Sequence, residues 1–82
     1  MRVLILCRSL TQAQRGAVLL EREGIHASVT KAPQGLSPKG CSYALSVYRS
    51  PERAAALLEA AGIQMGKVFR RLDSGAYEEL IL

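Results

Sequence analysis

The chain has 82 residues, which is enough for one hydrophobic core but not for two. Its 49% hydrophobic and 22% charged residues exclude a disordered chain, and its net charge of +4 is more typical of a solvated surface than of one that binds an anionic partner. No apolar run approaches the roughly 20 residues of a membrane span and no secretory signal is recognisable, so we expect a cytoplasmic protein.

The first half of the chain predicts a strand, a helix and a second strand. Residues 2–7 are nearly all apolar, as expected for a central strand. The helix is predicted to begin after Ser9, which has capping-box spacing to Gln12, and to end at Gly24, which can adopt the left-handed conformation found after many helices. Residues 25–30 then alternate apolar and polar side chains, a pattern typical of a half-buried strand.

Residues 31–40 are predicted to form a loop between the two halves. The segment contains two prolines and two glycines, at Pro33, Gly35, Pro38 and Gly40. At about ten residues it is longer than a hairpin requires, and long loops in small domains are often functional.

The second half repeats the pattern of the first. Residues 41–48 are rich in strand-forming residues, and 67–72 alternate again. Between them a helix is predicted to begin with Ser50 as its cap, Pro51 at its first position and an acid in its first turn.

An internal repeat supports this division. Residues 15–25 match the residues 38 positions further on, 53–63, at seven of eleven positions, including the Gly-Ile ending. Self-similarity of this kind indicates a supersecondary unit used twice. Chance similarity between two Ala/Leu-rich helices is the alternative, and the matched ending makes it less favoured.

The order of elements predicts a ferredoxin-like α+β fold. Its β-α-β-β-α-β arrangement forms an antiparallel four-stranded sheet with two helices on one face. We expect residues 1–75 to form this domain and residues 76–82 to be a C-terminal tail that packs on the domain or on a partner.

Two cysteines are expected at one end of this sheet. Cys7 ends the first strand and Cys41 begins the third, and these two strands are antiparallel neighbours in the predicted fold. Cys7 has the same parity as Val3 and Ile5, so packing in the core is its favoured interpretation. Cys41 lies next to Gly40, which gives room for another molecule, so here a functional role is favoured.

Positive charge is expected at the same end. The first helix begins there, and Lys31 adds a basic side chain. Such surroundings stabilise a thiolate, the reactive form of cysteine, or a bound anion. The predicted site therefore consists of two thiols and the groups that would stabilise them: Cys41, Cys7, Arg8, Ser9, Lys39 and Gly40.

No metal or cofactor is expected. The sequence has no Cys-x-x-Cys motif, and His26 is the only histidine, which favours an exposed strand residue over a ligand or a catalytic base. Tyr48 and Tyr77 are interpreted as packing residues.

The chain resembles the selenium/sulfur carrier-like family of small thiol proteins. The matching stretches are the first helix, the Gly24-Ile25 step, the proline-containing loop into Cys41 and the strand after it, so the resemblance covers roughly residues 3–69. The family usually has arginine and glycine where this chain has Gln34 and Ser42. The resemblance implies that Cys41 accepts sulfur or selenium as a persulfide or perselenide and passes it to a partner.

We expect a carrier or a binding protein rather than an enzyme that turns over a substrate. The expected partners are sulfur or selenium donor and acceptor proteins and a second copy of the chain in a homodimer, without a membrane. An RNA-binding sheet is a less favoured alternative, because only Tyr43 remains of the aromatic residues that such sheets use for stacking.

A regulatory or assembly module is the other alternative. Leu4, Leu6, Tyr43 and Leu45 are expected to form an apolar surface on the face of the sheet that the helices leave open. Either a second copy of the chain or the C-terminal tail would cover it.

Overall fold

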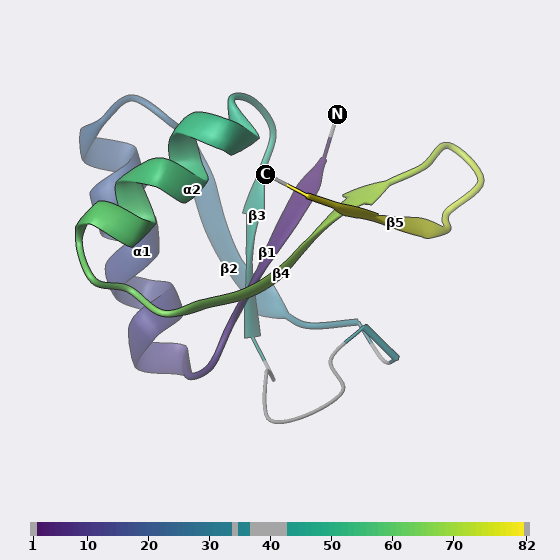
Figure 1. Ribbon diagram of the computed structural model, residues 1–82, viewed down its shortest axis with the longest axis horizontal. Coiled ribbons are helices and arrows are strands. Elements are labelled where there is room, and N and C mark those ends of the chain that lie inside the picture. Colours follow the sequence, from purple (N-terminus) through teal and green to yellow (C-terminus); the bar gives the residue numbers. More distant parts are fainter. Residues whose placement is uncertain (1, 34, 37–42, 82) are drawn as a thin grey trace.

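The computed structural model describes residues 2–33, 35–36 and 43–81. These residues form two helices and a five-stranded antiparallel sheet with the strand order β2-β3-β1-β4-β5 (Figure 1). The elements are β1 (Val3–Cys7), α1 (Leu10–Arg22), β2 (Ala27–Lys31), β3 (Tyr43–Val47), α2 (Pro51–Ala60), β4 (Met65–Arg71) and β5 (Tyr77–Leu80).

The prediction of a four-stranded sheet was wrong, because the segment expected to be a tail contains β5. The chain turns after β4 with Gly75 at a φ of +90°, and the Gly75 amide donates to the Leu72 carbonyl over 2.9 Å. β5 then pairs antiparallel with β4 from Arg71–Tyr77 to Val68–Leu80. The sequence Tyr-Glu-Glu-Leu lacks a regular alternation, so this pairing could not be inferred from its pattern.

Both helices end with the same motif, 38 residues apart. In α1 the amides of Gly24 and Ile25 donate to the carbonyls of Glu21 and Leu20, over 3.1 Å and 2.8 Å. In α2 the equivalent bonds, from Gly62 to Glu59 and from Ile63 to Leu58, both measure 3.0 Å. The two glycines have φ values of +81° and +76°, as this type of helix ending requires. The repeat in the sequence is therefore a repeat in backbone structure.

The two helix starts differ from each other. Ser9 caps α1 as predicted, since its hydroxyl accepts a hydrogen bond from the Gln12 amide over 3.2 Å. Ser50 occupies the N-cap position of α2 as predicted, but its side chain makes no hydrogen bond to the helix. Its backbone is left-handed, with φ +54°, whereas a capping side chain normally needs an extended backbone. Pro51 does open the helix, as expected.

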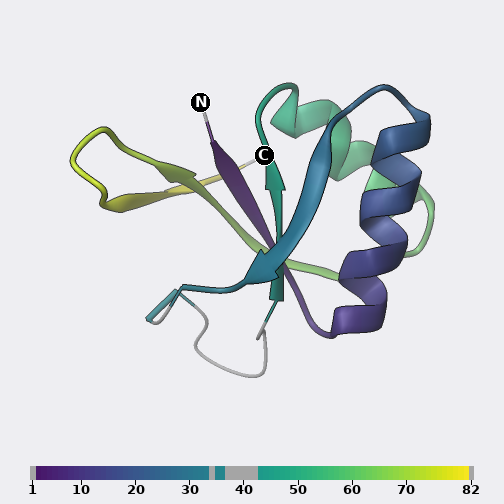
Figure 2. The same ribbon diagram turned by 180° about the vertical axis from the view of Figure 1, so that it is seen from behind.

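Both helices pack on one face of the sheet (Figures 1 and 2). The core between the helices and the sheet takes alternate residues of β1, namely Val3, Ile5 and Cys7, which are all buried. Gly16 lets α1 approach the sheet closely, because a Cβ atom there would lie 2.8 Å from the Leu45 Cδ1 atom.

A second, smaller core lies on the opposite face. It contains Leu4, Leu6, Ala44 and Phe69, with Ala32, Leu36 and Tyr77 packed against it. The expectation that Tyr43 and Leu45 share this face was wrong, because the register pairs Leu45 with Ile5 and directs it toward the helices. The chain thus covers Leu4 and Leu6 itself, partly with a residue of the expected tail.

The helix endings can be tested by substituting Gly24 and Gly62 with alanine. Nothing lies within 4 Å of the added Cβ atom at either position, so the cost comes from the left-handed backbone alone. We expect each substitution to lower the free energy of unfolding by about 1 kcal/mol, measured by urea denaturation. Gly24→Asn and Gly62→Asn should cost less, because asparagine tolerates this conformation. Unchanged stability in both alanine variants would contradict the assignment.

The cover over the second core can be tested at two positions of the C-terminal segment. Tyr77 is half-buried against Leu4 and its neighbours, whereas Ile81 is 95% exposed. Tyr77→Ala should cost about 2 kcal/mol of unfolding free energy, and the matched Ile81→Ala should change it by less than about 0.5 kcal/mol. Equal effects in thermal or chemical denaturation would show that Tyr77 does not cover this core.

Candidate functional site

Cys7 is a packed core residue at the end of β1. Its side chain is 0% exposed and belongs to the helix-side core that also contains Ala13 and Leu58. The thiol donates a hydrogen bond to the Ile5 carbonyl with a sulfur–oxygen distance of 3.6 Å. The structure therefore agrees with the packing interpretation that its parity with Val3 and Ile5 favoured.

The end of β1 lies beside the start of β3. These two strands are antiparallel neighbours, and Cys7 has Tyr43, the first residue of β3, as its Cα partner. On its other side Cys7 is opposite Met65 of β4, after an irregularity in the register. The predicted site residues Cys41, Lys39 and Gly40 lie outside the described residues. Tyr43, two residues after Cys41 in sequence, is the described residue nearest to it in that direction.

Two further residues of the predicted site, together with Lys31, occur at this end of the sheet. Arg8 and Ser9 are exposed in the step from β1 to α1, and the Ser9 hydroxyl is engaged with the first turn of the helix. Lys31 ends β2, is exposed, and has Tyr43 as its Cα partner. Neither Arg8 nor Lys31 forms an ion pair with another described residue. The end of the sheet around Cys7 and Tyr43 is thus flanked by positive charge and by a helix N-terminus.

The histidine does not contribute to this end of the sheet. His26 is exposed, and its Nδ1 atom lies 2.9 Å from Glu21 Oε1. The same carboxylate oxygen accepts a hydrogen bond from the Ala27 amide, so Glu21 links the end of α1 to the start of β2.

No cluster of three or more metal-ligating side chains occurs among the described residues. Over the same part of the chain, neither helix has the length and hydropathy needed to cross a bilayer.

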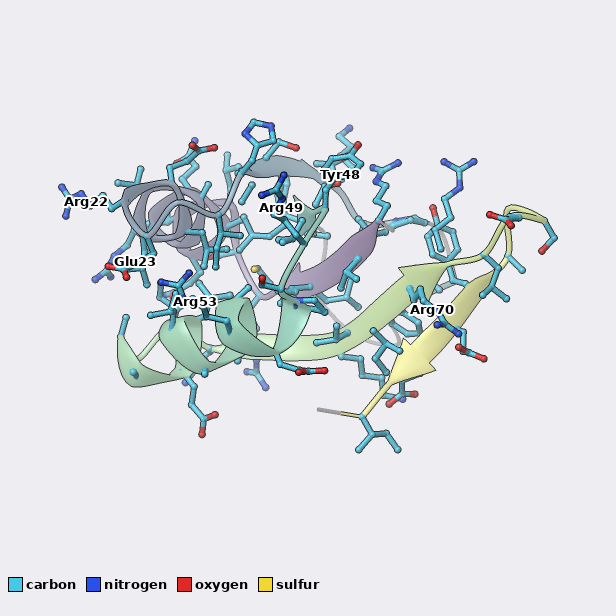
Figure 3. All side chains as sticks on the ribbon, turned by 90° about the horizontal axis from the view of Figure 1, so that it is seen from above. Arg22, Glu23, Tyr48, Arg49, Arg53 and Arg70 are labelled. Atoms are coloured by element: carbon cyan, nitrogen blue, oxygen red, sulfur yellow. The ribbon has the colours of Figure 1, made fainter. Side chains whose placement is uncertain are left out.

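The sequence interpretation missed one exposed aromatic residue. Tyr48 was expected to pack, but it is 55% exposed, directly after β3. It lies at the opposite end of β3 from Tyr43, next to Arg49 (Figure 3). The available signal was its position immediately before the polar Arg49-Ser50 step, where a strand typically leaves the core. Tyr77, by contrast, packs as expected.

The burial of Cys7 predicts slow chemical modification. Under reducing conditions iodoacetamide should leave Cys7 largely unmodified in the native protein and modify it fully in denaturant, because the alkylating agent cannot reach a buried sulfur. Peptide mass spectrometry of both samples measures this. Cys7→Ala should lower the free energy of unfolding by about 1 kcal/mol through the cavity it leaves. Rapid labelling of Cys7 in the native protein would contradict the buried position.

Comparison with known proteins assigns this chain to a family. No curated protein and no solved structure matches it significantly. The family model described as "Putative Se/S carrier protein-like" matches residues 2–70. This range includes both helices and the first four strands, apart from the last residue of β4, and it excludes β5. The match spans most of the chain and agrees with the resemblance seen in its motifs, so the chain belongs to this Se/S carrier-like family.

Proposed function

We propose that the protein carries sulfur or selenium on the thiol of Cys41. The observation that carries this proposal is the family match over residues 2–70, a range that contains both cysteines. The name of the family supplies the class of cargo, and the chemistry of the chain supplies the candidate group. Among protein side chains, a cysteine thiolate is the natural acceptor for sulfane sulfur because it is both nucleophilic and able to form a sulfur–sulfur bond.

The burial of Cys7 supports Cys41 as the carrier. A carrier thiol must contact a donor and then an acceptor, and the 0% exposed sulfur of Cys7 is not accessible to either. Cys41 is the other cysteine of the chain. We therefore assign a packing role to Cys7 and the transfer role to Cys41.

The transfer consists of two balanced exchange steps. In the first, the Cys41 thiolate attacks the outer sulfur of a donor persulfide, a new sulfur–sulfur bond forms on Cys41, and the donor leaves as a thiolate. In the second, an acceptor thiolate attacks the outer sulfur of the Cys41 persulfide, and Cys41 returns to its thiolate form. The transferred sulfur keeps its oxidation state, so neither step needs an external oxidant. A perselenide would form and transfer in the same way.

The charge around this end of the sheet supports such a mechanism. The N-terminus of α1, Arg8 and Lys31 favour a negatively charged sulfur near the start of β3. Lys39 and Gly40 precede Cys41 directly in sequence, and a lysine near a thiol also favours the thiolate.

We further infer a ferredoxin-like arrangement for the first four strands. The antiparallel order β2-β3-β1-β4 and the position of both helices on one face support it.

We also propose a cytoplasmic carrier that works with donor and acceptor proteins and forms a homodimer. Size-exclusion chromatography with light scattering would test the homodimer directly.

Sulfur loading provides the direct test of the carrier function. The reduced protein is incubated with a small-molecule persulfide, and intact-mass and peptide mass spectrometry locate any added sulfur atom. We expect one added sulfur atom, located on Cys41, which a thiol reductant removes. Cys41→Ser should abolish loading, and Cys7→Ala should load as the wild type does.

Two outcomes would contradict the proposal. If the wild type gains no sulfur, or if Cys41→Ser gains as much as Cys7→Ala, Cys41 is not the carrier group. The family's fold would then serve a binding or regulatory role without chemistry of its own.

A further inference from the structure

A basic and aromatic surface lies at the end of the sheet opposite to Cys7. It is formed by Arg2 before β1, Tyr48 after β3 and Arg71 at the end of β4. Arg2 and Tyr48 each lie one residue beyond the Val3–Val47 pair, and the Arg71 amide donates to the Arg2 carbonyl over 3.0 Å. Because neighbouring strands are about 4.8 Å apart, these residues form a row of three across the sheet.

The row lies on the face that the helices do not cover. The Arg2 Nε atom donates to Ser46 Oγ over 2.9 Å, and Ser46 alternates with Leu45 and Val47, which face the helices. Figure 3 shows Tyr48 on the side of β3 away from α1, with Arg49 nearer the helices. The hydrogen bond with Ser46 fixes the Arg2 side chain on this face by its Nε atom and leaves the terminal nitrogens available for a ligand.

Most of the aromatic side chains of the protein are found on this face. The chain has three tyrosines and one phenylalanine. Phe69 and Tyr77 belong to the second core, Tyr48 is exposed beside it, and Tyr43 alone packs against the helix-side core. RNA binding was less favoured from the sequence because Tyr43 was the one aromatic residue left at a stacking position. In the structure it is Tyr48, not Tyr43, that lies exposed on this face.

The charge on this face is mainly positive. Arg2 and Arg71 lie in the row, and neither forms an ion pair with another described residue. Further along β4, Lys67 Nζ lies 3.7 Å from Glu79 Oε1, so these two charges offset each other. Ala32 and Leu36, which follow β2, pack against the second core. At the arginine end Tyr77, the Cα partner of Arg71, packs against the second core, and the ring of Tyr48 stays exposed beside the two arginines.

We propose that this row, Tyr48, Arg2 and Arg71, binds single-stranded nucleic acid. An unpaired base stacks on the Tyr48 ring at one end of the row, while the guanidinium groups of Arg2 and Arg71, which both lie on the same side of the ring, contact successive phosphates of the strand. An exposed ring beside two arginine side chains on a sheet face fits an unstacked base better than a duplex, whose bases are not accessible for stacking. The row lies at the other end of β1 from Cys7.

Fluorescence anisotropy with a labelled single-stranded RNA oligonucleotide tests the proposal. Tyr48→Ala should weaken binding about tenfold, and Tyr48→Phe should bind as the wild type does because it keeps the ring. Arg71→Ala should weaken binding and reduce the slope of log affinity against log salt by about one. Arg15→Ala is the matched control: it removes the same charge from an exposed position on α1 and should leave both quantities unchanged.

Several results would overturn this proposal. They are the absence of binding, a duplex of the same sequence bound as tightly as the single strand, equal losses in Arg71→Ala and Arg15→Ala, and unchanged affinity in Tyr48→Ala. Binding to anionic lipid vesicles without binding to the oligonucleotide would assign the surface to a membrane instead. The Cys41→Ser variant should bind the oligonucleotide normally, so the result is independent of sulfur transfer.

Discussion

The burial of β1 on both of its faces is the constraint on which the rest of the structure depends. All five of its residues are buried, with alternate residues directed into the helix-side core and into the second core. It also pairs with β3 on one edge and with β4 on the other. A strand of this kind needs a layer on each side of the sheet. The helices supply the first layer, and the segment around Ala32 and Leu36, together with Tyr77, supplies the second.

The two ends of the sheet differ in the side chains that they expose. The N-terminus of α1, Arg8 and Lys31 lie where β1 ends and β3 begins. In sequence, β3 begins two residues after Cys41. At the other end, β1 begins beside the exposed ring of Tyr48 and the side chain of Arg71. Both ends are positive but differ in kind, since the first combines basic side chains with a helix N-terminus and the second places two arginines beside an exposed aromatic ring. The proposed nucleic-acid surface therefore lies at the end of β1 away from Cys7.

The burial of Cys7 distinguishes it from a cysteine that can react in solution. Both cysteines belong to the range matched by the family model, and the parity of Cys7 with Val3 and Ile5 already favoured a core position for it. Packing against α1 and α2 makes Cys7 part of the stability of the fold. It also removes one nucleophile from solvent, which would suit the proposed transfer of sulfur on the other thiol.

The sequence by itself determined the features that depend on neighbouring residues. The Ser9 cap, the paired helix endings at Gly24 and Gly62 and the core position of Cys7 all follow from short-range pattern and spacing. The family could also be recognised from its motifs. Only the tertiary structure decided which face Leu45 occupies, that β5 joins the sheet, and that Tyr48 is exposed beside Arg2. These features depend on pairing register between strands far apart in the chain, and a shift of one residue would reverse every side chain of a strand.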